Sequence, residues 1–175
     1  MPREHPQFQE FFAAHYPRLR RLGYWLTGDW TEAEELAQEA MVRTWWRWSI
    51  VRGHDRPHDY ARKVLVNQHR SLLRRTLVRA RHAARYEQPS SVAASDPTDA
   101  LVLWEATRRL PARQRAVVVL RFQEDLSEAE VARLLGLPVG TVKSTSSRAL
   151  ARLREQLGPA AEDLVGKIGR MTDDA

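Results

Sequence analysis

The chain has 175 residues, of which 43% are hydrophobic, and carries a formal net charge of +6. This length and composition suit one or two small folded domains and exclude an intrinsically disordered chain. The absence of cysteine excludes disulfides, thiolate metal sites and cysteine nucleophiles. No run of 18 apolar residues and no signal-peptide pattern occur, so we expect a cytoplasmic protein without membrane insertion.

Charge is distributed unevenly along the chain. Residues 29–39 contain five acids and no lysine or arginine, whereas residues 60–86 contain eight bases and no acid. The basic segment favours a polyanion such as nucleic acid, and the acidic segment favours a basic protein partner. Each run is also compatible with a solvated helix face, which is the commoner meaning of a single charged run.

The first predicted element is an amphipathic helix near the N-terminus. Apolar residues and His15 recur on one face between Phe8 and Leu26, at the spacing of an α-helix. Pro17 lies inside this pattern, and we expect it to kink or divide the helix. Gly28 follows the last apolar position and should end the helix.

Two further helices and a loop complete the first half. Residues 31–34, Thr-Glu-Ala-Glu, match a capping box that would open a second helix running to about Trp48. Residues 49–57 are rich in turn formers and predict a loop. A basic helix should begin near His58 or Asp59. Its expected buried side carries Leu65, Leu72 and Leu73.

The second half begins with a predicted linker and continues with four helices. Residues 87–98 contain two prolines and no apolar periodicity, which is typical of a linker. Helices are expected at about 99–109, 112–123, 128–135 and 139–156.

The predicted fold class is all-α, since no run alternates with a period of two. We expect two small helical domains, residues 1–86 and 99–158, joined by a flexible linker over residues 87–98. Residues 159–175 would form a tail with at most a weak turn of helix.

Residues 127–153 have the pattern of a helix-turn-helix. Residues 127–130, Ser-Glu-Ala-Glu, match a second capping box, and Gly136 and Pro138 separate the short helix from the next one. Such a second helix can enter a major groove, with short polar groups and a lysine meeting bases or phosphates and arginines meeting guanine or the backbone. The alternative is an ordinary helical hairpin with a polar exposed face. The candidate DNA-contacting residues are Thr141, Lys143, Ser144, Thr145, Ser147, Arg148 and Arg152.

Three tryptophans, Trp45, Trp46 and Trp48, follow the acidic segment. Because positions 46 and 48 are about 200° apart around a helix, we expect at least one of them to be partly exposed. Acids and an aromatic ring on a common side suit docking of a basic helical partner. The alternative is that all three tryptophans are core and the acids are solvated. That common side carries Glu35, Gln38, Glu39 and Trp46.

The loop and the basic helix form a candidate site for unpaired DNA. Aromatic rings such as that of Tyr60 can stack on unpaired bases when they lie beside a basic helix. Asn67 could read a base edge, although it could equally satisfy only backbone groups, and the arginines would hold phosphates. The candidate residues are Arg52, His54, Arg56, Lys63, Asn67, Arg70, Arg74 and Arg75.

Five motifs resemble the extracytoplasmic-function (ECF) group of the sigma-70 family of RNA polymerase sigma factors. Residues 35–45 read Glu-Leu-Ala-Gln-Glu-Ala-Met-Val-Arg-Thr-Trp, and residues 64–67 read Val-Leu-Val-Asn. Residues 110–115 read Leu-Pro-Ala-Arg-Gln-Arg, residues 120–122 Leu-Arg-Phe, and residues 140–144 Gly-Thr-Val-Lys-Ser. The order and spacing of these motifs agree with the family over about residues 8–158.

This resemblance implies a subunit of RNA polymerase that directs promoter-specific initiation through −10 and −35 recognition and promoter melting. Residues 1–86 would bind the polymerase clamp and read and open the −10 element, and residues 99–158 would read the −35 element. The resemblance also implies core RNA polymerase and promoter DNA as partners, a possible anti-sigma factor, no cofactor and no intrinsic catalysis. The implied clamp contacts are Glu35, Gln38, Glu39, Arg43 and Trp46.

The chain departs from the family pattern in three places. Glu35 stands where aspartate is usual, which is a mild change. Thr145 stands where arginine is common, so the preferred −35 sequence can differ. The loop over residues 49–57 has little identity to any one relative, so the −10 base it would read is not predicted.

Other classes explain parts of the sequence. A stand-alone helix-turn-helix repressor or activator would use residues 127–154 and bind its operator without polymerase, but it leaves the acidic helix without a role. An RNA-binding or tRNA-modifying protein would use the basic helix. An enzyme is least favoured, because no HExxH motif or Gly-rich phosphate loop occurs. His54 and His58 have metal-ligand spacing, but Pro57 lies between them without a third ligand nearby, so no metal site is expected.

Overall fold

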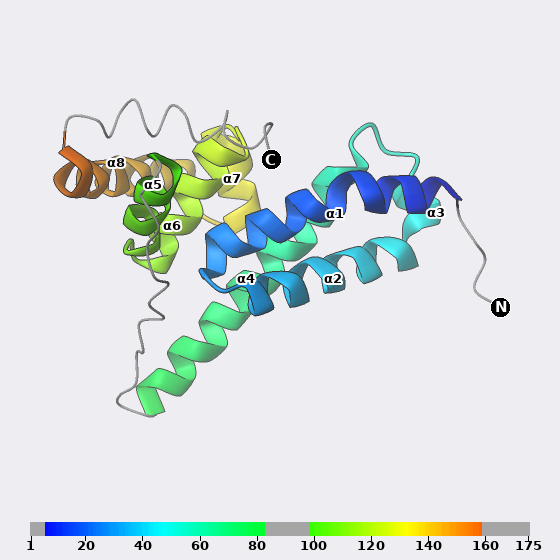
Figure 1. The fold of residues 1–175 in the computed structure, drawn as a ribbon, viewed down its shortest axis with the longest axis horizontal. Helices are drawn as coiled ribbons and strands as arrows, with labels where there is room; N and C mark the ends of the chain where they lie inside the picture. The colour runs from blue at the N-terminus through cyan, green and yellow to red at the C-terminus, as the bar shows by residue number, and fades with distance from the viewer. Residues whose placement is uncertain (1–5, 83–98, 159–175) are drawn as a thin grey trace. The chain divides into compact units, whose positions relative to one another are not determined.

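The computed structural model describes residues 6–82 and 99–158 (Figure 1). The chain divides into two compact units, Met1–Leu72 and Leu73–Ala175. All the regular elements in these residues are helical, which confirms the all-α prediction. The predicted linker, residues 87–98, and the predicted tail, residues 159–175, lie outside the described residues. No helix in the described segments is long and apolar enough to cross a membrane.

The first unit contains α1 (Pro6–Thr27), α2 (Trp30–Trp46), α3 (Trp48–Val51) and most of α4 (Pro57–His82). α1 and α2 lie side by side along their length (Figure 1). Their contact is apolar, as the periodicity of α1 predicts. Its fully buried side chains include Leu22, Leu26, Ala33, Ala40 and Met41.

Two expectations for the ends and continuity of these helices are confirmed in part. Gly28 ends α1: its N–H donates to the Tyr24 carbonyl at 2.8 Å, and its φ of +80° is one that glycine adopts without strain. The division of α1 at Pro17 is wrong, because the helix continues through it. Pro17 is exposed, and burial of the opposite side of α1 holds the helix together.

The predicted capping box of the second helix is wrong by two residues. Asp29, and not Thr31, is the N-cap: its Oδ1 accepts a hydrogen bond from the Glu32 N–H at 2.9 Å. Asp29 has extended backbone angles and follows Gly28 directly, so the helix begins at the first position where a cap is available. Thr31 therefore lies within the first turn.

α2 ends at Trp46 and not at Trp48, because the backbone leaves the helical region at Arg47 and a new short helix, α3, begins. This break turns Trp48 into the core, where it is 5% exposed, while Trp46 remains 75% exposed. The expectation that one of the two is exposed is confirmed, and the alternative that all three tryptophans are core is wrong. Leu72 was expected on the buried side of the basic helix, but it is 44% exposed.

The second unit contains α5 (Asp99–Arg108), α6 (Ala112–Val118), α7 (Glu128–Leu135) and α8 (Val139–Leu157), with a π-helical turn, η1 (Val119–Gln123), after α6. The expected helix over residues 112–123 therefore ends as a π-helix. The residues from Ala116 to Leu120 are all buried, so this segment is enclosed by the unit. Its core cluster consists of Leu103, Ala106, Leu110, Val118, Ala149 and Leu153.

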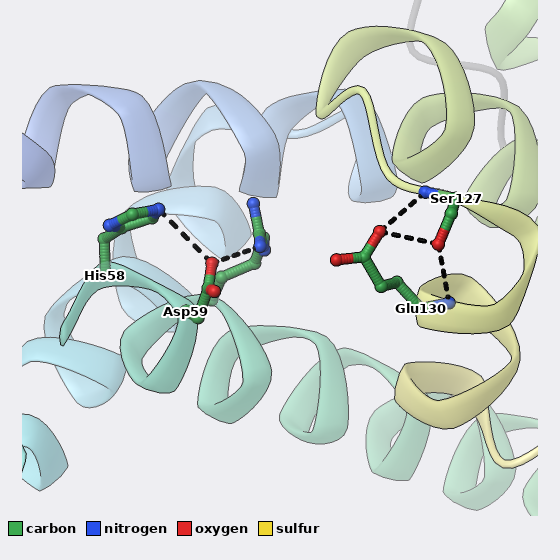
Figure 2. Close-up of polar contacts among 5 residues, drawn as sticks. His58, Asp59, Ser127 and Glu130 are labelled. Carbon is green, nitrogen blue, oxygen red and sulfur yellow. Dashed lines mark hydrogen bonds and ion pairs between the residues drawn. The ribbon is translucent and has the colours of Figure 1, made fainter. Parts of the chain in front are cut away.

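The helix-turn-helix prediction is confirmed in its local detail. The Glu130 N–H donates to Ser127 Oγ at 3.2 Å, and Glu130 Oε2 accepts from the Ser127 N–H at 2.8 Å, which is the predicted capping box (Figure 2). Gly136 ends α7 in the left-handed conformation with a φ of +64°. Pro138 then precedes the first residue of α8.

Gly23 permits the close approach of α1 and α2, which leads to a stability prediction. A Cβ at this position would lie 2.9 Å from both the Cα and the carbonyl oxygen of Ala33, which are backbone atoms that cannot turn aside. We expect Gly23→Ala to lower the free energy of unfolding by about 1–2 kcal/mol, measured by urea denaturation. Gly140→Ala is the control, because a Cβ there meets nothing within 4 Å; it should be neutral or slightly stabilising. Equal effects of the two substitutions would contradict the packing argument.

Candidate docking and nucleic-acid surfaces

The solvent side of α2 carries a stripe that we call the α2 face. It consists of Glu35, Gln38, Glu39, Val42 and Trp46, all exposed, at the i, i+3, i+4, i+7 and i+11 spacing of one helix side. The buried side of the same helix faces α1, so the α2 face is not needed for packing within this unit. The structure therefore brings together four of the predicted clamp residues and adds Val42, which follows from the same spacing.

Arg43 lies beside the α2 face and pairs with one of its acids. Its Nε donates to Glu39 Oε1 at 2.7 Å, with both side chains about half exposed. Exposed pairs of this kind contribute little to stability, about 0.3–0.5 kcal/mol between positions one turn apart. The Glu39 carboxylate can therefore exchange Arg43 for a basic group of a partner at small cost.

The segment Arg52–Arg56 between α3 and α4 is exposed and contains three predicted DNA contacts, Arg52, His54 and Arg56. Backbone hydrogen bonds from Gly53 and His54 to the end of α3 shape its first turn. Ile50, on α3, is 64% exposed beside this segment and was not predicted. The available sequence signal was an isoleucine just before a segment that contains two arginines.

The outer side of α4 carries Lys63, Asn67, Arg70 and Arg74 at the i, i+4, i+7 and i+11 spacing of one stripe. Lys63 and Arg74 are exposed, and Asn67 and Arg70 are half-buried. Arg75 is exposed but points away from this stripe by helix geometry.

The basic segment contributes less exposed charge than its composition indicates. Arg62, which directly precedes Lys63 in the sequence, is buried and pairs with Asp59. The exposed lysine and arginine side chains of α4 therefore begin at Lys63.

In the second unit, α8 presents most of the predicted contacts to solvent. Lys143, Ser147, Arg148 and Arg152 are exposed, and Thr141 and Ser144 are half-buried. Arg148 Nη2 lies 3.4 Å from Ser144 Oγ, which is long for a hydrogen bond and leaves the guanidinium able to reach outward.

The placement of Thr145 on the exposed side of α8 is wrong. Thr145 is 7% exposed and lies on the buried side with Val142 and Ala149, because positions three and four residues apart share a helix side. Helix spacing grouped Thr145 with Thr141 and Arg148 on the polar side. The same spacing also joins it to the apolar side, and it is this side that takes up Thr145. The exposed side is better described by Ser144, Ser147 and Arg148.

No group of three or more His, Asp or Glu side chains within residues 6–82 and 99–158 could hold a metal ion. His54 is exposed. His58 is half-buried, and its Nε2 lies 3.2 Å from Asp59 Oδ1 (Figure 2).

Comparisons with known proteins give the same picture for both units. The protein-family model of Sigma-70 region 2 matches residues 11–79, and the protein-family model of Sigma-70, region 4 matches residues 100–153. The RNA polymerase sigma-E factor of Streptomyces coelicolor is 36% identical over 159 residues, covering 90% of this chain and 89% of the relative. The ECF RNA polymerase sigma factor SigM of Mycobacterium tuberculosis is 30% identical over 151 residues, covering 86% of this chain and 77% of the relative.

The fold is also similar to that of a solved structure, the sigma factor RpoE in complex with the anti-sigma factor NepR from Bartonella quintana. The TM-score is 0.72 at 23% identity, and the match covers 89% of this chain and 99% of that one. At this identity the similarity concerns the fold alone.

Proposed function

The chain belongs to the ECF group of the sigma-70 family of RNA polymerase sigma factors, and we propose that the α2 face is the surface by which it binds core polymerase. As a sigma factor it directs promoter-specific transcription initiation. The observation that carries the proposal is Trp46, a large aromatic side chain that is 75% exposed at one end of the α2 face, on a helix whose other side is packed against α1. Aromatic side chains that become buried in a protein interface often dominate its binding energy.

For the −10 element, we propose the Arg52–Arg56 segment and the outer stripe of α4. Exposed arginines and a histidine beside exposed Ile50 offer both charge for phosphates and an apolar surface for a base. The stripe that starts at Lys63 and ends at Arg74 continues this basic surface along the helix. These features support recognition of a strand whose bases are unpaired.

For the −35 element, we propose the exposed side of α8. Ser144, Ser147 and Arg148 stand on that side within the first half of the helix, as in a recognition helix whose N-terminal part meets base edges. Lys143 and Arg152, also exposed, suit phosphates. Thr145 is not part of this proposal, since it is buried.

The proposed organisation is a −10 domain over residues 1–86, a linker over residues 87–98 and a −35 domain over residues 99–158. The family to which the chain belongs acts without enzymatic activity of its own, and we propose that this chain, acting in the cytoplasm, leaves all catalysis to polymerase. We also propose that an anti-sigma factor restrains it. RpoE, a sigma factor of similar fold, is bound by the anti-sigma factor NepR, and the proposal extends that kind of regulation to this chain.

A stand-alone helix-turn-helix repressor is disfavoured by the α2 face, for which it provides no partner. The decisive experiment is the affinity of the purified chain for bacterial core RNA polymerase, measured by fluorescence anisotropy. We expect tight one-to-one binding. If no binding occurs at micromolar concentration, or if the chain alone binds duplex operator DNA specifically at nanomolar concentration, the proposal is wrong.

Glu39→Lys should weaken binding to core polymerase by roughly tenfold, because it replaces a carboxylate on the α2 face with a cation that repels a basic partner and Arg43 alike. The fold should persist, since the Glu39 side chain is about half exposed. Glu10→Lys makes the same change of net charge at an exposed position of α1 away from the α2 face, and it should bind normally. Normal affinity of the Glu39→Lys chain would refute the charge contact.

A further inference from the structure

One side of α1 contacts the first residue of the Arg52–Arg56 segment and a residue on each side of the segment. The contacting residues of α1 are spaced by four, so they share one side of the helix and span about 12 Å along it. One contact is a long, exposed hydrogen bond of 3.5 Å, and the other two, which hold the row more firmly, are ring contacts with centroids 5.0 Å and 5.5 Å apart. The three contacts are Gln7 with Arg52, Phe11 with Trp48, and His15 with His58.

These contacts bracket the segment in the chain. Trp48 is the first residue of α3, just before the segment, and His58 is the second residue of α4, just after it. On α1, Phe11 and His15 also contact each other, with centroids 4.5 Å apart. The rings therefore form a continuous row from α3 through α1 to α4, and a single rigid helix sets the distance between the two ends of the segment.

A second set of contacts fixes the first turn of α4 behind this row. Asp59 pairs with His58 at 3.2 Å and with the buried Arg62 (Figure 2). The Asp59 N–H donates to the Arg56 carbonyl at 3.1 Å, which joins the last residue of the segment to the helix. Movement of His58 relative to α1 would therefore be transmitted to Arg56.

We propose that the α1 row, Gln7, Phe11 and His15, is a positioning element for the Arg52–Arg56 segment, and that the contact between His15 and His58 makes this positioning sensitive to pH. The inference rests on the proposed role of the segment at the −10 element. The three residues act through Trp48, Arg52 and His58, and no contact with DNA is assigned to Gln7, Phe11 or His15. At low pH the row should loosen at its α4 end.

The physical basis of the pH sensitivity is the surroundings of the two imidazoles. Burial lowers the pKa of His15 below its usual value, and His58 and Arg18 lower it further. Burial also lowers the pKa of His58; Asp59 opposes this shift, whereas Arg62, Arg18 and Arg56 add to it.

The direction of the pH effect follows from these lowered pKa values. In the unfolded chain both histidines take up protons below about pH 6.5, and in the folded chain they do so only at lower pH. The stability that they contribute is therefore fully present above about pH 6.5 and is lost as the pH falls from there through the lowered values. Two stacked cationic rings would also repel each other.

Three variants of the full-length chain separate ring contact from charge. His15→Ala removes the ring, and His15→Phe keeps an aromatic ring that cannot be protonated. Tyr16→Phe is the control: it alters the adjacent residue of α1, whose hydroxyl donates to Glu34 at 3.4 Å on the α2 side, and leaves the row intact.

The first measurement is hydrogen exchange of the free chain at about pH 7.5 and about pH 5.5, corrected for intrinsic exchange rates. The wild type and Tyr16→Phe should lose protection across residues 51–62 at the lower pH. His15→Ala should show low protection at both values, and His15→Phe should show a smaller pH effect than the wild type. Wild-type protection and pH response in both His15 variants would overturn the proposal.

The second measurement is promoter opening by the holoenzyme, detected by the permanganate reactivity of unpaired thymines. The promoter fragment is one that wild-type holoenzyme transcribes in a run-off assay. If the segment holds its working arrangement for only about a tenth of the time, the apparent affinity falls about tenfold, and His15→Ala should open the promoter correspondingly less. His15→Phe should open it nearly as well as the wild type and with a weaker pH dependence.

Arg56→Ala separates the two ways in which this could fail. If Arg56→Ala impairs opening while His15→Ala does not, the segment reads DNA but the row does not position it, and the inference is overturned alone. If neither variant impairs opening, the proposed role of the segment at the −10 element fails, and the inference fails with it.

Discussion

Replacing Trp46 with alanine should weaken binding of the chain to core RNA polymerase by about 30-fold or more, which corresponds to about 2 kcal/mol. Trp46 lies at one end of the α2 face and is 75% exposed, so the free chain gains little from its burial and its indole is available to a partner. Burial of such a ring against polymerase would recover that apolar contact. Fluorescence anisotropy with labelled chain gives the affinity, and urea denaturation should show an unchanged free energy of unfolding.

Two other tryptophans serve as controls for this experiment. Trp30→Ala removes a second exposed indole that stacks on Tyr24 and lies away from the α2 face, and it should bind polymerase normally. Trp48→Ala should instead lower the free energy of unfolding by about 3–5 kcal/mol, because this ring is buried. Equal affinities of the Trp46→Ala and Trp30→Ala chains would show that the α2 face is not the docking surface.

The different fates of Trp46 and Trp48 show how far periodicity predicts exposure. Their angular separation on a helix requires that they face different ways, and this follows from the sequence. Which of them is buried depends on the break at Arg47, which starts a new helix and directs Trp48 toward Phe8 and Phe11 of α1. A break set by tertiary packing leaves no local signal at Arg47 itself.

The two predicted helix caps had different outcomes, although a second residue that could cap lies two positions away in both cases. Asp125, two residues before Ser127, has a φ of +51°. The helix begins after Ser127, and the predicted capping box is present in every hydrogen bond. At the start of α2, two residues could serve, and Asp29 forms the cap because Gly28 ends the preceding helix immediately before it. The choice depended on where α1 ended, which the cap motif alone does not contain.

Site residues were predictable where helix spacing assigned them to one side only, and the prediction failed where a residue borders both the polar and the apolar side or where charge was taken to mean exposure. The stripe from Lys63 to Arg74 and the α2 face both follow the spacing of their helices. Thr145 and Arg62 are polar or charged in sequence and yet buried. Arg62 is accommodated by pairing with Asp59, a contact between neighbouring turns that composition does not distinguish from solvation.

The row on α1 shows the limit of reasoning from a single element. His15 is part of the apolar face of its helix in the sequence pattern, where it has the properties of an ordinary core residue. Its stacking on His58 depends on the way α4 packs against α1, which brings together residues 43 positions apart in the sequence, from 15 to 58. No periodicity within either helix contains that information.

Arg148→Ala should weaken −35-dependent transcription. If its guanidinium reads guanine through two hydrogen bonds, the loss of binding free energy at the −35 element should be about 1–3 kcal/mol. Arg148 is exposed on the same side of α8 as Ser144 and Ser147, and its contact with Ser144 is long enough to be released for a base. The loss should be confined to promoters with guanine at the contacted position. In vitro transcription from promoter variants at the −35 element measures it, and an unchanged promoter profile would remove Arg148 from the site.

Two further substitutions on α8 distinguish base reading from general attraction to DNA. Lys143→Ala, at an exposed position suited to phosphate, should weaken binding about equally on all promoters. It should also reduce the slope of log affinity against log salt concentration by about one. Thr145→Val alters a side chain buried against the core of the second unit, so it should change stability without changing promoter preference. A change in −35 preference with Thr145→Val would mean that α8 presents a different side to DNA from the one that is exposed in the free chain.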